Sequence, residues 1–111
     1  MPKDLYCWRC DMVVPMLTEP EWVVMEPALR KAMTDVQAYR TTHGVGLSEA
    51  LHQGYGQSAV ELYRELTGFP ETNAASIWHH RISDHGPPCQ ACGKPLRTPR
   101  ASFCAACGTR A

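Results

Sequence analysis

The chain has 111 residues, of which 44% are hydrophobic and 20% charged, a size that suits one compact domain or a domain with a small module attached. Its 11 Lys and Arg residues balance its 11 Asp and Glu residues, so it lacks the net positive charge of a protein that coats nucleic acid. No run approaches the roughly 18 apolar residues of a membrane span, and the start at Met1 lacks the apolar stretch of a signal peptide. We therefore expect a cytoplasmic protein without a membrane contact.

Cys7 and Cys10 near the start form the first of three Cys-x-x-Cys pairs, and the residues from Asp11 to Pro15 have an extended pattern. A Cys-x-x-Cys pair beside a Trp also occurs in thioredoxin-like redox sites. Those sites begin a helix that follows a strand, whereas only six residues precede Cys7 and no βαβ pattern follows. We interpret the pair as a metal-binding knuckle, from which Trp8 projects unless a neighbouring segment covers its ring.

The first helix signal lies at Thr18. Thr18 is a suitable N-cap, Glu21 completes a capping box, and Pro20 stands in the first turn, where its missing N–H costs nothing. Apolar residues then recur at steps of three and four, and Gly44 ends the segment. The pattern predicts an amphipathic helix to about Thr42. Its expected core face consists of Trp22, Met25, Leu29, Ala32, Met33, Val36 and Tyr39.

Two shorter helices are expected in the middle of the chain. Ser48 can cap the first, and Ser58 with Glu61 can form a capping box for the second, which stops at Gly68. Gly54-Tyr55-Gly56 separates them as a turn rather than a phosphate loop, because no strand precedes it and the Lys of such a loop is missing. The second helix is expected to turn four apolar residues inward: Ala59, Leu62, Tyr63 and Leu66.

A last short helix, capped by Thr72 or Asn73, is expected to run through Trp78. Pro87 and Pro88 then make the approach to the C-terminal cysteines extended. Between the helix and these prolines lies a cluster of three histidines, which are candidate metal ligands: His79, His80 and His85.

The two remaining Cys-x-x-Cys pairs lie close together near the C-terminus, and a glycine follows each of them. Two residues between cysteines allow both thiolates to face one cation, and zinc binds four such ligands in a tetrahedron. A glycine after each knuckle supplies the positive φ that this turn commonly needs. A disulfide framework is the competing interpretation, but it belongs mainly to secreted chains.

This stretch, CxxCG-KPLRTPRASF-CxxCG, resembles the small zinc-ribbon family, in which two knuckles flank a short β-hairpin with an aromatic residue, here Phe103, before the third cysteine. The resemblance covers residues 89–111 only. It implies one Zn²⁺ ion with four thiolate ligands: Cys89, Cys92, Cys104 and Cys107. Ribbons of this kind serve many functions, so the resemblance indicates a metal and a fold without an activity.

Cys7 and Cys10 then lack partners within their own segment. We expect them to hold a second Zn²⁺ together with His85 and one of His79 or His80, and we take His80. One alternative is a reduced pair that packs beside the ribbon. Another is that Cys7 and Cys10 share a metal with one of the C-terminal knuckles.

Charge is divided unevenly along the chain. Residues 1–84 carry seven basic and eleven acidic side chains, whereas residues 85–111 carry four basic side chains and no acidic one. The basic ribbon can pack against the acidic helices, or use Arg97 and Arg100 at its hairpin tip to bind nucleic acid. In a further alternative, the acidic helical face meets a basic partner.

The sequence therefore predicts a mainly α protein: a helical domain over residues 1–88, with its cysteine knuckle packed near a small β-hairpin zinc ribbon over residues 89–111. A four-cysteine zinc site has no open position, and no catalytic constellation is present, so we expect no enzyme. The balance of features favours a protein-binding module that neutralises or regulates a partner, as immunity proteins, antitoxins and adaptors do, with Trp8 in the contact. The alternative is a nucleic-acid-binding ribbon that uses Arg97 and Arg100.

Overall fold

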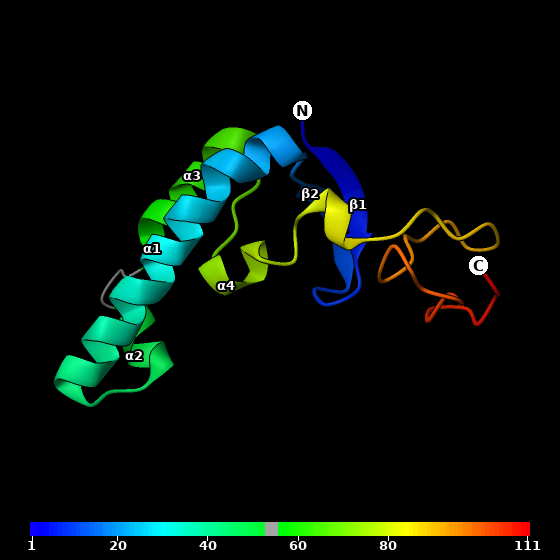
Figure 1. Cartoon of the computed structure of the whole chain (residues 1–111). Coiled ribbons are helices and arrows are strands. Elements are labelled where there is room, and N and C mark those ends of the chain that lie inside the picture. The colour runs from blue at the N-terminus through cyan, green and yellow to red at the C-terminus, as the bar shows by residue number, and fades with distance from the viewer. Residues whose placement is uncertain (53–55) are drawn as a thin grey trace.

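The computed structural model describes residues 1–52 and 56–111, so the expected turn at Gly54-Tyr55 lies outside the described residues. A two-stranded hairpin is followed by helices and then by an irregular C-terminal segment (Figure 1). The molecule is elongated, 49 × 28 × 21 Å, with the helices at one end and the C-terminal segment at the other. The elements are β1 (Lys3–Cys7), β2 (Met12–Met16), α1 (Glu19–His43), α2 (Leu47–His52), α3 (Gln57–Thr67), α4 (Ala74–Ile77) and a 3-10 turn (Ile82–Asp84).

Strands β1 and β2 pair antiparallel, with Cys7 opposite Met12, so the first cysteine knuckle forms the turn of this hairpin. Asp11 closes the turn with φ = 53°, and its carboxylate accepts a hydrogen bond from the Tyr6 hydroxyl. The extended pattern of residues 11–15 is confirmed as β2, whereas β1 was not expected. Cys7, Val14 and Met16 make a small core of their own on one side of the hairpin.

Helix α1 begins and ends where its local signals indicate. The Glu21 carboxylate accepts hydrogen bonds from the backbone N–H (2.9 Å) and the hydroxyl (2.8 Å) of Thr18, and Gly44 ends the helix with φ = 64°. Most of the expected apolar face is buried, but Met33 is 48% exposed and the prediction for it is wrong. The face that packs against α3 and α4 has five buried residues: Trp22, Met25, Leu29, Ala32 and Val36.

Helix α3 lies along α1, and Gly68 ends it with φ = 79° (Figure 1). The expected capping box of Ser58 and Glu61 is wrong, because α3 begins at Gln57 and Gly56 occupies the N-cap position. At α4 the Asn73 side chain does accept the capping hydrogen bond, from the N–H of Ala75 at 3.0 Å. The helical core joins eight buried residues: Leu17, Trp22, Met25, Leu29, Ala32, Ala59, Tyr63 and Ile77.

The β-hairpin expected between the C-terminal knuckles is wrong, and with it the predicted fold class. The only hairpin of strands in the described residues is the N-terminal one, and the C-terminal segment has isolated bridges, Pro88 to Pro95 and Phe103 to Arg110. Each bridge spans one knuckle instead of linking the two. Prolines supply no N–H donor, so a ladder cannot extend from the Pro88–Pro95 bridge. Four of them stand in this segment: Pro87, Pro88, Pro95 and Pro99.

Among the described residues, the structure has no helix long and apolar enough to cross a bilayer.

Candidate metal centres

The four C-terminal cysteines meet at one point, with their sulfur atoms all within 4.8 Å of one another. The sulfur atoms of Cys89 and Cys107 are 3.7 Å apart, and those of Cys92 and Cys104 are 3.6 Å apart. Two sulfurs that share a tetrahedral ion at about 2.3 Å lie about 3.8 Å apart. The donor set and its spacing therefore fit a metal ion in a zinc-ribbon-like arrangement.

The turn of each C-terminal knuckle is closed by its glycine. Gly93 (φ = 79°) donates its N–H to the Cys89 carbonyl at 2.9 Å, and Gly108 (φ = 81°) donates to the Cys104 carbonyl at 2.7 Å. The positive φ expected at both glycines is confirmed, and a side chain there would strain the backbone. This geometry leaves the N–H groups inside the knuckle free to face the sulfur atoms.

Local donors favour the thiolate form at two of these cysteines. Backbone N–H groups of Cys92 and Ala91 lower the pKa of the Cys89 thiol. A hydrogen bond with Thr109, whose hydroxyl oxygen lies 3.3 Å from the Cys107 sulfur, lowers the pKa of Cys107 to about 6. Thiolates are the form that binds a metal. Cys92 differs, because a hydrogen bond from the Lys94 backbone is outweighed by burial and Cys104, which raise its pKa to about 11.

The interior beneath the four cysteines is small. Cys89, Leu96 and Cys104 are buried and Ala101 packs against them, while Phe103 is 56% exposed. The aromatic residue before the third cysteine therefore does not cover the centre, and Leu96 takes the buried position. With so little apolar surface to bury, the segment gains little stability from hydrophobic packing, and a metal ion on the four cysteines would add to it.

The second group of ligands lies between the hairpin turn and the residues after α4. Ligand atoms of Cys7, Cys10 and His79 are within 4.8 Å of one another, with Cys7 buried and the other two half-buried. Backbone hydrogen bonds hold these segments together: Leu17 donates to the His80 carbonyl at 2.8 Å, and Ile82 donates to the Leu17 carbonyl at 3.0 Å. This group can also bind a metal ion.

His80 lies next to this group and is completely buried. Its Nε2 is 3.4 Å from the Cys10 sulfur, and its Nδ1 is 3.1 Å from the Tyr63 hydroxyl oxygen. Burial lowers the pKa of His80 to about 4 and raises the pKa of Cys10 to about 11. The imidazole is therefore neutral at pH 7, as a metal ligand must be.

His85, the other histidine of the predicted set, is turned elsewhere. It is 9% exposed, and its Nε2 lies 3.0 Å from the His79 carbonyl, to which it donates. The Nδ1 atoms of His79 and His85 are buried and lack a hydrogen-bond partner among the described residues. The structure thus brings His79 to Cys7 and Cys10 and leaves His85 outside the group.

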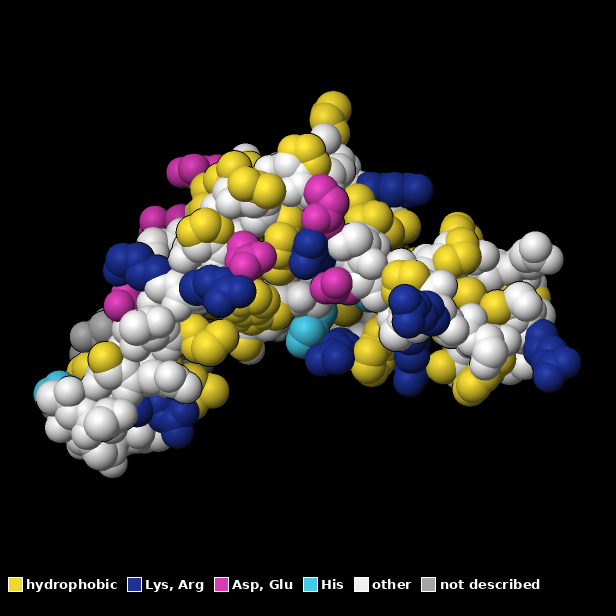
Figure 2. Space-filling model, in the orientation of Figure 1, with side chains coloured by type: hydrophobic (Ala, Val, Ile, Leu, Met, Phe, Trp, Pro, Cys, Tyr) yellow, Lys and Arg dark blue, Asp and Glu magenta, His cyan; other side chains and the backbone are white. Residues whose placement is uncertain are grey.

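Trp8 is half-buried under two guanidinium groups. The Arg9 and Arg97 guanidinium carbons lie 4.8 Å and 4.3 Å from its ring centroid, and the Lys94 ammonium lies 4.2 Å from the Tyr6 ring. The basic segment thus packs on aromatic residues of the hairpin, and no salt bridge within the described ranges joins it to the acidic helices. Figure 2 shows Lys and Arg over the C-terminal part and all the visible Asp and Glu over the rest.

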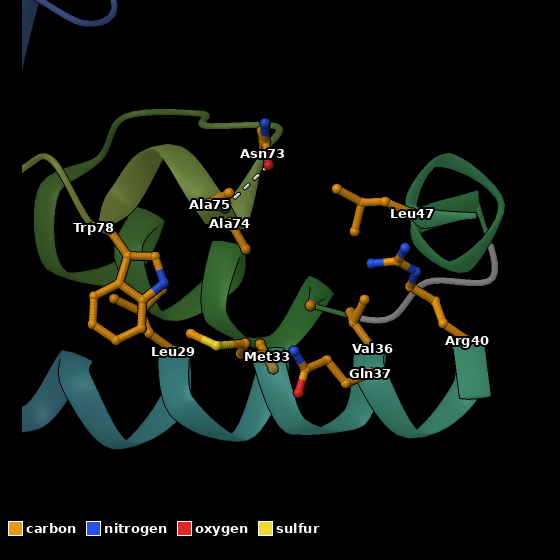
Figure 3. A pocket seen from close by; sticks show the side chains of 12 residues that line it. Leu29, Met33, Val36, Gln37, Arg40, Leu47, Asn73, Ala74, Ala75 and Trp78 are labelled. Atoms are coloured by element: carbon orange, nitrogen blue, oxygen red, sulfur yellow. Dashed lines mark hydrogen bonds between the residues drawn. The ribbon is translucent and has the colours of Figure 1, made fainter. Parts of the chain in front are cut away.

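An apolar cavity of about 280 Å³ opens at the other end of the molecule, between α1, the start of α2 and α4 (Figure 3). Met33 and Leu47 stand at its sides, each about half exposed, with Trp78 at one end and Arg40 at the other. The helical periodicity of α1 predicts Met33 as a core residue and gives no sign of the cavity. The cavity exists because α2 and α4 leave this turn of α1 uncovered, which the sequence of α1 alone does not show.

Comparison of the chain with models of protein families, with curated proteins and with solved structures gave no match.

Proposed function

We propose that this chain is a zinc protein whose helical part binds another protein and thereby regulates or neutralises it. The metal assignment follows from the donor set, because four thiolates in a closed tetrahedral arrangement favour zinc over the oxygen-binding Mg²⁺ and Ca²⁺ ions. A closed centre of this kind has a structural role, so we expect a partner to bind elsewhere on the surface. The apolar cavity between α1, α2 and α4 is the observation that carries the proposal.

The zinc assignment is tested by native mass spectrometry of a Cys7→Ser/Cys10→Ser variant. We expect this variant to keep one Zn²⁺ ion, held by the four C-terminal cysteines. A Cys89→Ser/Cys92→Ser variant, which removes half of that centre, is the matched comparison and is expected to lose this ion. A metal-free Cys7→Ser/Cys10→Ser variant would contradict the assignment.

The cavity has the composition of a site for a protein anchor residue. Its walls are apolar, with Met33, Leu47 and Trp78 in reach of an incoming side chain, and Gln37 and Arg40 supply a polar edge. An apolar pocket with a polar rim is the usual surrounding of an interface hot spot. The sequence suggested Trp8 as the partner contact, but Arg97 covers the ring of Trp8. We therefore place the partner contact at the cavity instead.

The binding proposal is tested with two matched substitutions on α1. Met33→Asp places a charge in the cavity wall, and Val24→Asp places one at a similarly exposed position (53%) outside it. Tagged protein is used to capture partners from nuclease-treated lysate of the source cells. We expect wild type and Val24→Asp to capture the same partner, and Met33→Asp to lose it with unchanged zinc content. Equal capture by all three would contradict the proposal.

A nucleic-acid-binding function is the second candidate, and the charge of the C-terminal part favours it. Residues 85–111 carry four basic side chains and no acidic one, and Arg100 and Arg110 are exposed. This function requires an affinity for RNA or DNA that falls steeply with rising salt. It also requires that an Arg97→Ala/Arg100→Ala variant lose this affinity while the cavity variants keep it.

A further inference from the structure

The identity of the fourth ligand decides what kind of metal centre Cys7, Cys10 and His79 can form. These three groups supply two thiolates and one imidazole, which is one ligand fewer than a structural zinc site. A closed site needs a fourth donor from the chain, whereas an open site takes water. The two nearest unassigned imidazoles belong to His80 and His85.

Hydrogen bonds determine which nitrogen of His80 carries the free lone pair. The Tyr63 hydroxyl has one hydrogen and donates it to the Pro15 carbonyl, so its oxygen can only accept from His80 Nδ1–H. Nε2 of the neutral ring therefore carries the lone pair, and it faces the Cys10 sulfur at 3.4 Å. When Cys10 is a thiol, its S–H donates a hydrogen bond to this lone pair.

Metal binding changes this contact. Once Cys10 has lost its proton to bind a cation, the thiolate and the Nε2 lone pair face each other in a partly buried position, which is unfavourable. The cation itself relieves this if both groups bind it. The observed separation supports such sharing, because a thiolate and an imidazole on one tetrahedral zinc ion lie about 3.5 Å apart.

We propose that Cys7, Cys10, His79 and His80 form a second, closed zinc centre with two sulfur and two nitrogen ligands. Tyr63 then acts as a positioning residue, because its hydroxyl oxygen holds Nδ1–H and turns Nε2 toward the metal. His80 lies outside the group of three ligand atoms that are within 4.8 Å of one another, so closing the centre would require its ring to come nearer to Cys7 and His79. The centre ties the β1–β2 turn to the residues after α4.

His85 does not serve as the fourth ligand in this arrangement. Its Nε2–H bonds to the His79 carbonyl, whereas Nε2 of His80 faces the Cys10 sulfur. That hydrogen bond steadies the backbone of a ligand residue instead. Two of the three clustered histidines, His79 and His80, are therefore metal ligands, and His85 holds the backbone of His79.

The first test uses the wild-type chain, so that it does not depend on a variant folding. Native mass spectrometry of zinc-loaded protein is expected to show two Zn²⁺ ions per chain. The protein loaded with ¹¹³Cd is expected to give two resonances, one at the position of a four-sulfur site and one at that of a site with two sulfurs and two nitrogens. One ion per chain, or a second resonance typical of coordinated water, would overturn the proposal.

Substitutions then identify the two histidines. His79→Ala and His80→Ala are each expected to weaken binding of the second Zn²⁺ ion at least tenfold, while the first ion stays bound. Tyr63→Phe, which keeps the ring and removes the hydroxyl, is expected to weaken it about tenfold to a hundredfold. His43→Ala, at the far end of α1, is the control and leaves both ions bound.

His85→Ala discriminates between the proposed set and the set that the sequence suggested. We expect this variant to bind two Zn²⁺ ions, with less than a tenfold change in the affinity for the second. If His85→Ala loses the second ion and His80→Ala keeps it, His85 is the fourth ligand and the proposal is wrong. If neither variant loses it, the fourth position is open to solvent and the proposal is equally wrong.

Discussion

Gly86 lies where two stretches of the C-terminal segment pack closely against each other. Its N–H donates to the Leu96 carbonyl at 2.8 Å, which draws the two stretches of chain together. A Cβ atom at this position would lie 2.4 Å from the Thr98 carbonyl oxygen and 2.8 Å from Leu96 Cβ. Only a residue without a side chain allows this approach.

Gly86→Ala is therefore predicted to lower the free energy of unfolding of the zinc-loaded protein by roughly 1–3 kcal/mol, the usual cost of overpacking. The measurement is denaturant unfolding followed by Trp fluorescence and by release of zinc. Gly46→Ala is the control, because a Cβ there meets nothing within 4 Å, and its effect is expected to stay below about 1 kcal/mol. Equal effects of the two substitutions would contradict this account of Gly86.

The start of each helix shows how far a local motif determines an element. Thr18–Glu21 and Ser58–Glu61 have the same capping-box pattern, yet the structure contains only the first. The second fails because α3 begins at Gln57, which places Ser58 inside the helix. A pattern that is favourable on its own is overridden when the helix starts two residues earlier, with Gly56 as the N-cap.

Substitution of the two glutamates separates these cases. Glu21→Ala removes the acceptor of two hydrogen bonds from Thr18 and is predicted to cost about 1 kcal/mol of stability. Glu61→Ala, at an exposed position in α3, is predicted to change stability by less than about 0.5 kcal/mol. Thermal unfolding of both variants measures the difference, and a larger loss for Glu61→Ala would count against the capping assignment.

The interiors of the helical part and of the C-terminal segment differ greatly in size, and a third small core lies at the hairpin. The helical core contains eight fully packed apolar residues, whereas the interior of the C-terminal segment consists of two cysteines and Leu96. Hydrophobic burial can stabilise the first interior by itself. The second has so little apolar surface that we expect a metal ion held by its cysteines to supply most of its stability.

Removal of zinc with a chelator is therefore predicted to unfold residues 89–111 and to leave α1 and α3 helical. Hydrogen exchange measured by mass spectrometry should show loss of protection after Pro88, while the helical circular dichroism signal stays nearly constant. This experiment also tests the division into a helical domain over residues 1–88 and a metal-dependent unit beyond it. Loss of the whole helical signal upon chelation would show instead that the chain folds as one unit.

Much of the local structure could be predicted because its determinants lie within a few residues of one another. The extended residues after Asp11, the start of α1 and the glycines that end α1 and α3 all follow from backbone conformation and capping. The expected C-terminal hairpin is wrong because prolines in this segment, among them Pro88 and Pro95 at the first bridge, supply no N–H donor for a ladder.

Two-residue spacing brings the thiolates of each cysteine pair together, so the sequence alone indicates that the cysteines act in pairs and that four of them suit one metal ion. Which histidine joins Cys7 and Cys10 depends on tertiary packing, since these residues are some 70 positions apart and meet where Leu17, the residue after β2, pairs with the segment after α4. The cover of Arg97 over Trp8 and the cavity beside Met33 likewise depend on how elements are placed against each other. That placement follows from packing of the whole chain, which no short segment specifies.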